Sequence, residues 1–194
     1  PGKLTLNGSF NLRDDKRNSD GWTKRTYLFD NSIHNTESSE IRHMQSQMAR
    51  LGADYNFSRL FSVGVGANFN WGKRFNDESV NYTDVVKAYQ NLWIRTSDEK
   101  ENMIRTEYTA YMLKKFNTNG HEWRIDYSYN TENEDENNLY INRYFLNDSI
   151  FGNEKETNSS KNNRHTLQSD YTWPVNDKIK VEAGIKVMFL QTEN

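Results

Sequence analysis

The chain has 194 residues, of which 34% are hydrophobic, with a formal net charge of −2 and a mean hydropathy of −1.03. Its 25 basic and 27 acidic residues are interspersed, which argues against a nucleic-acid-binding surface. The absence of cysteine excludes a disulfide framework and thiolate metal sites. Such polarity is typical of disorder, yet 13% of the residues are aromatic. The sequence therefore predicts a folded protein with patterned polarity.

Period-two alternation of apolar and polar residues is the strongest pattern along the chain. In the stretch FSVGVGANFNW, Phe61, Val65 and Trp71 fall on one side, while Ser62 and Asn68 fall on the other. Seven such stretches are found, at residues 4–12, 49–57, 61–71, 104–116, 123–129, 167–173 and 179–189. The sequence thus predicts about seven long antiparallel β-strands.

The connections between these strands alternate in length. Residues 56–60, 117–120 and 174–177 have the composition of tight turns and recur about every 60 residues. The polar stretches 14–40, 76–102 and 131–163 are predicted to be long loops. Within them, residues 83–94 carry apolar residues at helical spacing and predict a short helix, and residues 140–146 predict an extension of a strand.

Short turns at one end and long loops at the other favour an antiparallel transmembrane β-barrel with periplasmic turns and extracellular loops. Residues 61–71 span roughly 34 Å of strand, or roughly 25 Å of height when tilted, which matches the apolar band of such a barrel. An odd number of strands does not close a barrel, so we expect an internal segment. The predicted lipid-facing residues are Phe61, Val63, Val65, Phe69, Trp71, Ile179, Val181, Ile185, Val187 and Phe189.

Three stretches carry a resemblance to a known family: LGADYNFSRLFSVGVGANFNWGKRFND (51–77), RTSDEKENM (95–103) and HEWRIDYSYNTENEDENN (121–138). They resemble the outer membrane protein β-barrel family, in which the barrel forms the carboxy-terminal part of TonB-dependent receptor-like proteins. The resemblance implies that residues 1–194 are part of one barrel domain, with the plug domain and the remaining strands outside this chain.

The implied function is uptake of a scarce ligand of the siderophore, glycan or peptide class across the outer membrane of a Gram-negative bacterium. The implied partners are outer-membrane lipid, an amino-terminal plug, and the TonB system acting through that plug. Two alternatives stay open. One is a plugless porin or structural barrel, and the other is a soluble secreted β-sheet that binds a ligand.

Catalytic motifs are missing from the sequence, since the four histidines have no HExxH spacing and no serine lies in a GxSxG motif. We therefore predict no enzyme activity, no cofactor and no metal. The acidic stretches at 97–101 and 133–138 offer oxygen ligands for Ca²⁺, but a solvated acidic loop explains them better. Gly52, Gly64, Gly66, Gly72 and Gly184 lie on the polar side of their strands, where they leave a surface for a plug or allow the sheet to curve.

Aromatic residues in the predicted loops are the candidates for contact with a ligand, because exposed rings stack on sugars, peptides and hydrophobic chelates. The alternative is that these rings pack the loops against one another. The predicted ligand-binding residues are Tyr82, Tyr89, Trp93, Tyr140 and Tyr144.

Overall fold

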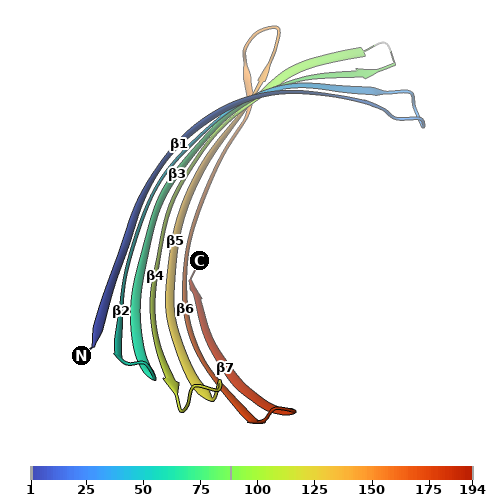
Figure 1. Ribbon diagram of the computed structural model, residues 1–194. Coiled ribbons are helices and arrows are strands. Elements are labelled where there is room, and N and C mark those ends of the chain that lie inside the picture. Colours follow the sequence, from blue (N-terminus) through green and yellow to red (C-terminus); the bar gives the residue numbers. More distant parts are fainter. Residues whose placement is uncertain (1, 88, 194) are drawn as a thin grey trace.

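The computed structural model describes residues 2–87 and 89–193, which form a single antiparallel sheet of seven strands (Figure 1). Each strand pairs with the next one along the chain, so the spatial order is the sequence order. The predicted all-β fold and the seven strands are confirmed. The strands are β1 (Lys3–Thr26), β2 (Ile33–Ser58), β3 (Phe61–Val86), β4 (Tyr89–Lys115), β5 (Glu122–Tyr144), β6 (Ile150–Asn176) and β7 (Ile179–Glu193).

The strands are much longer than the alternating stretches that predicted them. β3 has 26 residues and β4 has 27, so each extends over roughly 85 to 90 Å. The predicted long loops are therefore wrong, because most of residues 14–40, 76–102 and 131–163 belong to strands. Above the alternating stretches both faces of the sheet are polar, so the period-two signal disappears while the backbone ladder continues.

Short turns connect the strands at both ends of the sheet. The upper hairpins in Figure 1 turn at residues 27–32, after Val86, and at residues 145–149. Asn31, Lys87 and Asp148 in these turns have positive φ values of 57°, 54° and 53°. At the lower end, Gly120 has a φ of 86°, which glycine adopts without strain.

The predicted helix over residues 83–94 is also wrong, because this stretch is the end of β3 and the start of β4. Tyr82 pairs with Trp93 and Val86 pairs with Tyr89 in the antiparallel ladder. The apolar spacing that resembled a helix comes from two strands of a hairpin joined near Lys87. The predicted strand extension at 140–146 is confirmed as far as Tyr144, the last residue of β5.

One face of the sheet is apolar over its lower half, and its rows follow the hydrogen-bond register. Leu6, Ala53, Val65, Ala110, Tyr127, Leu167 and Val187 form one such row across all seven strands. Their neighbours along each strand point to the opposite, polar face. The ten residues predicted to face lipid all lie on the apolar face.

The apolar band crosses these rows obliquely. The row of Leu12, the upper limit of the band on β1, reaches β7 at Glu193, four residues above Phe189, the last residue of the band on β7. The row of Leu4, the lower limit on β1, reaches β7 at Ile185, six residues above Ile179. The band thus descends toward the tight turns from β1 to β7.

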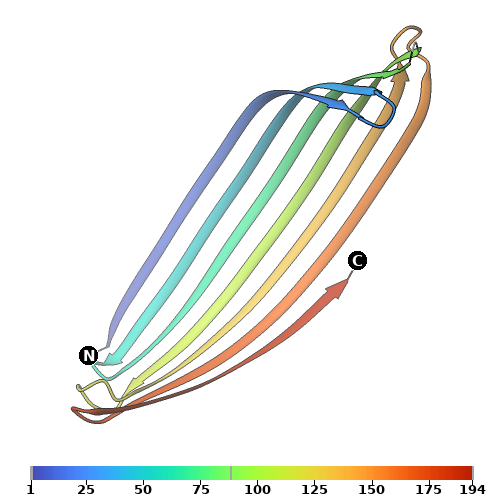
Figure 2. The ribbon, with the colours of Figure 1, turned by 90° about the vertical axis from the view of Figure 1, so that its right-hand side faces the viewer.

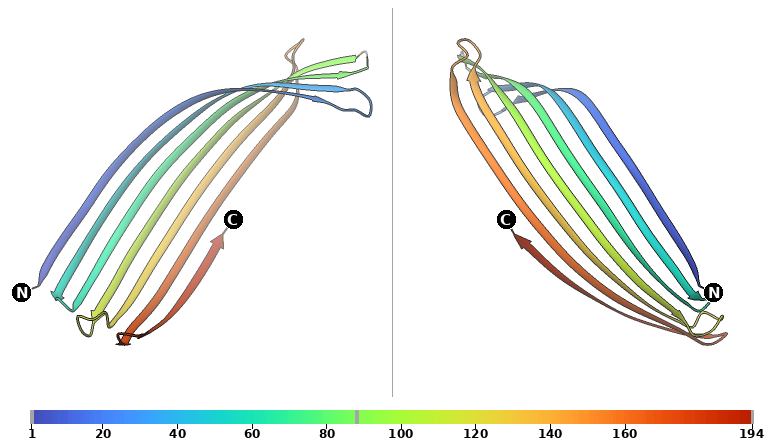
Figure 3. Two further views of the ribbon diagram at one scale, coloured as in Figure 1. Left: turned by 45° about the vertical axis from the view of Figure 1, so that its right-hand side comes forward. Right: turned by 90° about the vertical axis from the view of Figure 1, so that its left-hand side faces the viewer.

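The sheet is curved but open, as the views in Figures 2 and 3 show. β1 and β7 are its two edges. β7 pairs only with the part of β6 from Lys161 to Asn176, which leaves the upper part of β6 as an edge as well. No hydrophobic residue in the described part of the chain is buried, so the sheet has no core of its own.

Candidate functional site

The polar face carries all the buried side chains of the described residues. They are Asn76, Ser97, Glu101 and Asn138, each at most 9% exposed. On the apolar face, in contrast, Val65, Ile185 and Phe189 are more than 60% exposed. Polar side chains are packed together on one face, and apolar side chains are exposed on the other. A binding site made of polar groups therefore lies on the polar face.

Side chains on this face reach across neighbouring strands. Tyr111 on β4 lies over Gly64 on β3 and donates a hydrogen bond of 2.7 Å to Asp54 on β2. A Cβ on Gly64 would lie 2.2 Å from the Tyr111 ring, so only glycine leaves room for this contact. The guanidinium of Arg124 on β5 lies over the Tyr111 ring, 4.8 Å from its centroid.

The other glycines of this face show the same arrangement, with one exception. Asn7 occupies the space over Gly52, Thr109 the space over Gly66, and Asp170 the space over Gly184, all within 2.7 Å of an added Cβ. At Gly72 an added Cβ meets nothing nearer than 3.9 Å. The glycines therefore make room for side chains of this sheet itself, and Gly72 alone of the five leaves an open surface.

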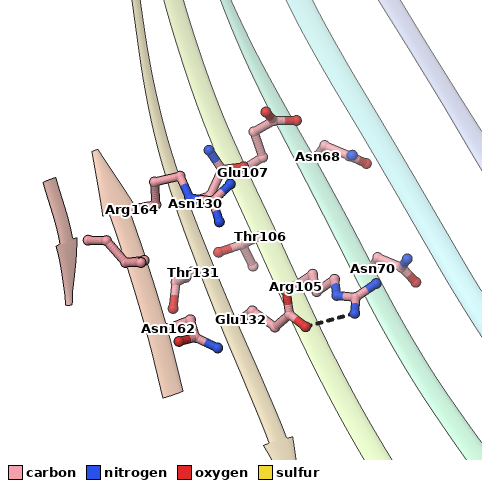
Figure 4. Close-up of a pocket in the computed structure, with 11 residues that line it drawn as sticks. Asn68, Asn70, Arg105, Thr106, Glu107, Asn130, Thr131, Glu132, Asn162 and Arg164 are labelled. Carbon is pink, nitrogen blue, oxygen red and sulfur yellow. Dashed lines mark hydrogen bonds and ion pairs between the residues drawn. The ribbon is translucent and has the colours of Figure 1, made fainter. Parts of the chain in front are cut away.

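A polar hollow of about 220 Å³ lies midway along this face (Figure 4). Arg105 of β4 forms an ion pair of 2.7 Å with Glu132 of β5 at its edge. The buried Oδ1 of Asn68 accepts no hydrogen bond from the part of the chain that the structure describes. Amide groups that both donate and accept suit a ligand rich in hydroxyl or amide groups. Four asparagines line the hollow, Asn68, Asn70, Asn130 and Asn162, together with Glu107 and Arg164.

An aromatic cluster lies nearer the upper tips of the strands. The rings of Tyr82 and Trp93 are stacked at 3.7 Å with an interplanar angle of 2°. Trp93 donates its indole N–H to Asp84 at 3.0 Å, and Asp84 also pairs with His34 of β2. Phe151 of β6 meets Trp93 edge-on at 5.8 Å, so the cluster joins β2, β3, β4 and β6.

The structure brings together three of the five predicted ligand-binding aromatics. The Tyr144 ring lies 4.5 Å from the Phe151 ring at an angle of 35°, and Phe151 connects it to Trp93 and Tyr82. Tyr140 lies apart from them, with the guanidinium of Arg95 4.5 Å from its ring. Burial, and then the charges of Glu99 and Glu156, raise the pKa of the Tyr140 phenol. Tyr89 lies at the tip of the hairpin and is 72% exposed.

Sequence reasoning missed four residues of this region: His34, Asp84, Arg95 and Phe151. Each lies in a stretch that was predicted to be a loop, for which no pairing partner is assigned. Had the strands been extended through those stretches, the register would have placed His34 opposite Asp84. Within residues 2–87 and 89–193, no group of three or more acidic or histidine side chains is arranged to hold a metal ion.

The described residues contain no helix long and apolar enough to cross a membrane. The fold is that of an outer-membrane β-barrel wall, with consecutive antiparallel strands, one apolar face and one ionic face. Residues 114–194 match the model of the outer membrane protein beta-barrel family, the same family that the sequence resembles. None of the curated proteins matches the chain.

Two solved structures are similar to the chain over almost its whole length. One is P. aeruginosa FpvA bound to a heterologous pyoverdine with iron, with 6% identity and a TM-score of 0.34. The other is the ferric citrate transporter FecA in its unliganded form, with 9% identity and a TM-score of 0.37. The matches cover 96% and 98% of this chain, which spans only 37% and 38% of the two proteins.

Proposed function

We propose that this chain forms part of the wall of an outer-membrane receptor barrel that takes up a scarce ligand with energy from the TonB system. The observation that carries the proposal is the continuous apolar face, which crosses all seven strands and is covered by nothing in the described residues. An apolar surface of this extent does not remain in water. In the outer membrane of a Gram-negative bacterium, acyl chains cover it.

The width of the apolar band supports the proposal. Residues 61–71 span roughly 34 Å along β3, and the oblique course of the band gives a strand tilt of roughly 30°. The resulting height of roughly 29 Å is slightly more than the apolar band of about 25 Å in outer-membrane barrels and does not exceed the hydrocarbon thickness of a typical bilayer, about 30 Å. The ten lipid-facing residues named from the sequence lie within this band.

Aromatic residues border the band on both sides, as the girdles of membrane barrels do. Toward the upper tips, Phe69 stacks with Trp71 at 5.9 Å, and Tyr129 stacks with His165 at 4.6 Å. Toward the tight turns, Phe57 stacks with Phe61 at 5.1 Å. The upper border lies lower on β5 and β6 than on β3, in keeping with tilted strands.

In this proposal, the polar hollow of Figure 4 lines the lumen and the aromatic cluster at Tyr82 and Trp93 faces the ligand from outside the cell. A plug domain and further strands, outside this chain, complete the receptor. The family match and the aromatic cluster support this assignment, while a plugless porin would use the same wall around an open pore.

Two measurements on the full-length protein test the proposal. It should need detergent to stay monodisperse, and a protein that is monodisperse in plain buffer would contradict the membrane assignment. In planar bilayers a plugged receptor should show no steady conductance, whereas a porin should conduct continuously. Steady open channels would contradict the plugged receptor and support the porin.

A further inference from the structure

The upper part of the polar face of β4, β5 and β6 is strongly acidic. We define the acidic wall as Glu99, Glu101, Glu134, Glu136, Glu154 and Glu156, which alternate along these strands above the apolar band. Register places Glu101 directly opposite Glu136. Like charges in this position destabilise a sheet, so the arrangement is not explained by the stability of the strands.

The acids of the wall lack the cations that neutralise acids elsewhere on the same face. On β1, Asp15 lies 2.7 Å from both Arg13 and Arg17, and on β2 Arg42 holds the pKa of Glu40 below its usual range. Within the described residues, Glu101 is the only acid of the wall with an ion pair, to Arg74 of β3.

The two arginines on the same face of β4 at this level are already engaged: Arg105 pairs with Glu132, and Arg95 stacks on Tyr140. Burial, followed by the charges of Glu101 and Glu132, raises the pKa of Glu134. The wall thus holds more negative charge than its own strands balance.

A second feature of the wall, independent of charge, is a set of buried acceptors with no donor. Asn138, 8% exposed, lies opposite both Glu99 and Glu156. Its Nδ2 donates to Glu136 at 2.9 Å, but its Oδ1 has no hydrogen-bond partner among the described residues. Asn76 of β3 lies opposite Glu99 of β4 and donates its Nδ2 to that glutamate at 3.1 Å. Within residues 2–87 and 89–193, its Oδ1 is likewise buried without a partner. Buried polar atoms are normally satisfied, so these oxygens call for a donor from outside the sheet.

The spacing of the wall indicates the shape of what supplies that donor. Glu134 and Glu136 on β5, and Glu154 and Glu156 on β6, repeat every second residue, which is roughly 6.8 Å along the strand. Alternate side chains of an extended peptide have the same repeat. A guanidinium group offers five N–H donors in a planar fork, enough for a carboxylate and a neighbouring amide oxygen.

We propose that the acidic wall binds an extended basic peptide, whose arginine side chains pair with the glutamates and donate to the orphaned amide oxygens of Asn76 and Asn138. The inference rests on the polar face lining the lumen, as in the proposed function, but it does not depend on uptake or on a plug. Its site lies on β3 to β6, below the aromatic cluster.

The test uses the full-length protein in detergent and two labelled hexapeptides, one of alternating arginine and glycine and one of alternating glutamate and glycine. Fluorescence anisotropy measures their binding. The variants are E134Q/E136Q and E154Q/E156Q. The matched control is D98N/D135N, which removes the same charge from β4 and β5, but on the opposite face of the sheet. Circular dichroism verifies that each variant keeps its β-sheet.

We expect the arginine peptide to bind and the glutamate peptide not to bind. E134Q/E136Q and E154Q/E156Q should each weaken binding of the arginine peptide by about fivefold to tenfold, because each removes two partly buried ion pairs. The control D98N/D135N should change the affinity by less than about twofold. The inference would be overturned if D98N/D135N weakened peptide binding as much as the two glutamate variants do. It would also be overturned if the arginine peptide did not bind to the parent protein.

Titration with Ca²⁺ alone provides the remaining arm. The inference would fail if Ca²⁺ gave a heat of binding with the parent protein, E134Q/E136Q abolished that heat, and the arginine peptide did not compete with Ca²⁺. The wall would then be a metal site. None of these outcomes depends on detergent requirement or conductance, so failure here is distinguishable from failure of the proposed function.

Discussion

At the scale of single residues, the polar face is organised by side chains that cross a strand over a glycine. Tyr111 reaches Asp54 only because Gly64 between them has no side chain. The pattern of alternation predicted that this glycine lies on the polar side, but not what covers it. A residue's partner two strands away depends on the register of both intervening ladders, which a single sequence does not specify.

The first prediction concerns this contact. Gly64→Ala should displace the Tyr111 ring from Asp54 and cost about 1 to 3 kcal/mol of stability, because a hydrogen bond to a carboxylate is lost. Thermal unfolding of the full-length protein in detergent measures the effect. The matched control is Gly72→Ala, whose added Cβ has open space. Equal destabilisation by both substitutions would show that the Tyr111 contact is not responsible.

The second prediction concerns Asp15, which lies between two arginines of its own strand. Hydrogen bonds from Arg17 and then from Arg13 lower the pKa of Asp15 to about 2. Because the folded-state pKa is lowered, the stabilising ion pairs are fully present above about pH 4 and are lost as the pH falls through about 2.

Carbon-13 NMR of the Asp15 carboxyl should therefore show a titration midpoint near 2, and Arg17→Gln should move that midpoint up toward 3.8. A midpoint near 3.8 in the parent protein would mean that the arginines do not hold the carboxylate in solution.

At the scale of elements, the sequence predicted where each strand crosses the apolar band but not where it ends. Alternation is visible only where one face contacts an apolar environment and the other a polar one. In β3, Phe61 to Trp71 satisfy this condition, whereas Lys73 to Val85 have polar residues on both faces. The aromatic cluster was predicted only in part for the same reason. Its tyrosines and tryptophan can be recognised from the sequence alone, but their contacts on neighbouring strands cannot.

The third prediction follows from the length of the hairpins. Backbone amides of β3 and β4 above the band, at residues 76–84 and 92–100, are paired in the ladder. Hydrogen–deuterium exchange of the full-length protein should therefore show protection there well above that of the exposed turn at residues 145–149. Complete exchange of residues 76–84 at the earliest time point would restore the long-loop interpretation.

At the scale of the whole molecule, the oblique apolar band relates the register of the sheet to its orientation in a bilayer. The band descends by four residues at its upper limit and by six at its lower limit over six strand spacings. In the proposed membrane orientation, about 4.8 Å between strands and 3.4 Å per residue give a strand tilt of roughly 30° from the bilayer normal. Membrane barrels have tilts of about 35–45°, so the register alone gives nearly the expected geometry.

The last prediction tests this orientation directly. Leu6 on β1 and Val187 on β7 share one hydrogen-bond row, yet Leu6 is one apolar position above the lower limit of the band and Val187 one below its upper limit. Across six spacings a tilt of roughly 30° separates the two residues by roughly 15 Å in depth. Leu6 should lie in the periplasmic half of the bilayer and Val187 in the outer half.

Spin labels on single cysteines at these positions, compared by collision with oxygen and with a water-soluble nickel chelate, measure the two depths in the full-length protein. A label at Lys186, next to Val187 but on the polar face, is the control and should be accessible to the chelate. Equal depths for Leu6 and Val187 would mean that the strands run parallel to the bilayer normal. Access of the chelate to both Leu6 and Val187 would show that the apolar face does not lie in the membrane, because a surface in contact with acyl chains excludes a charged or hydrated probe.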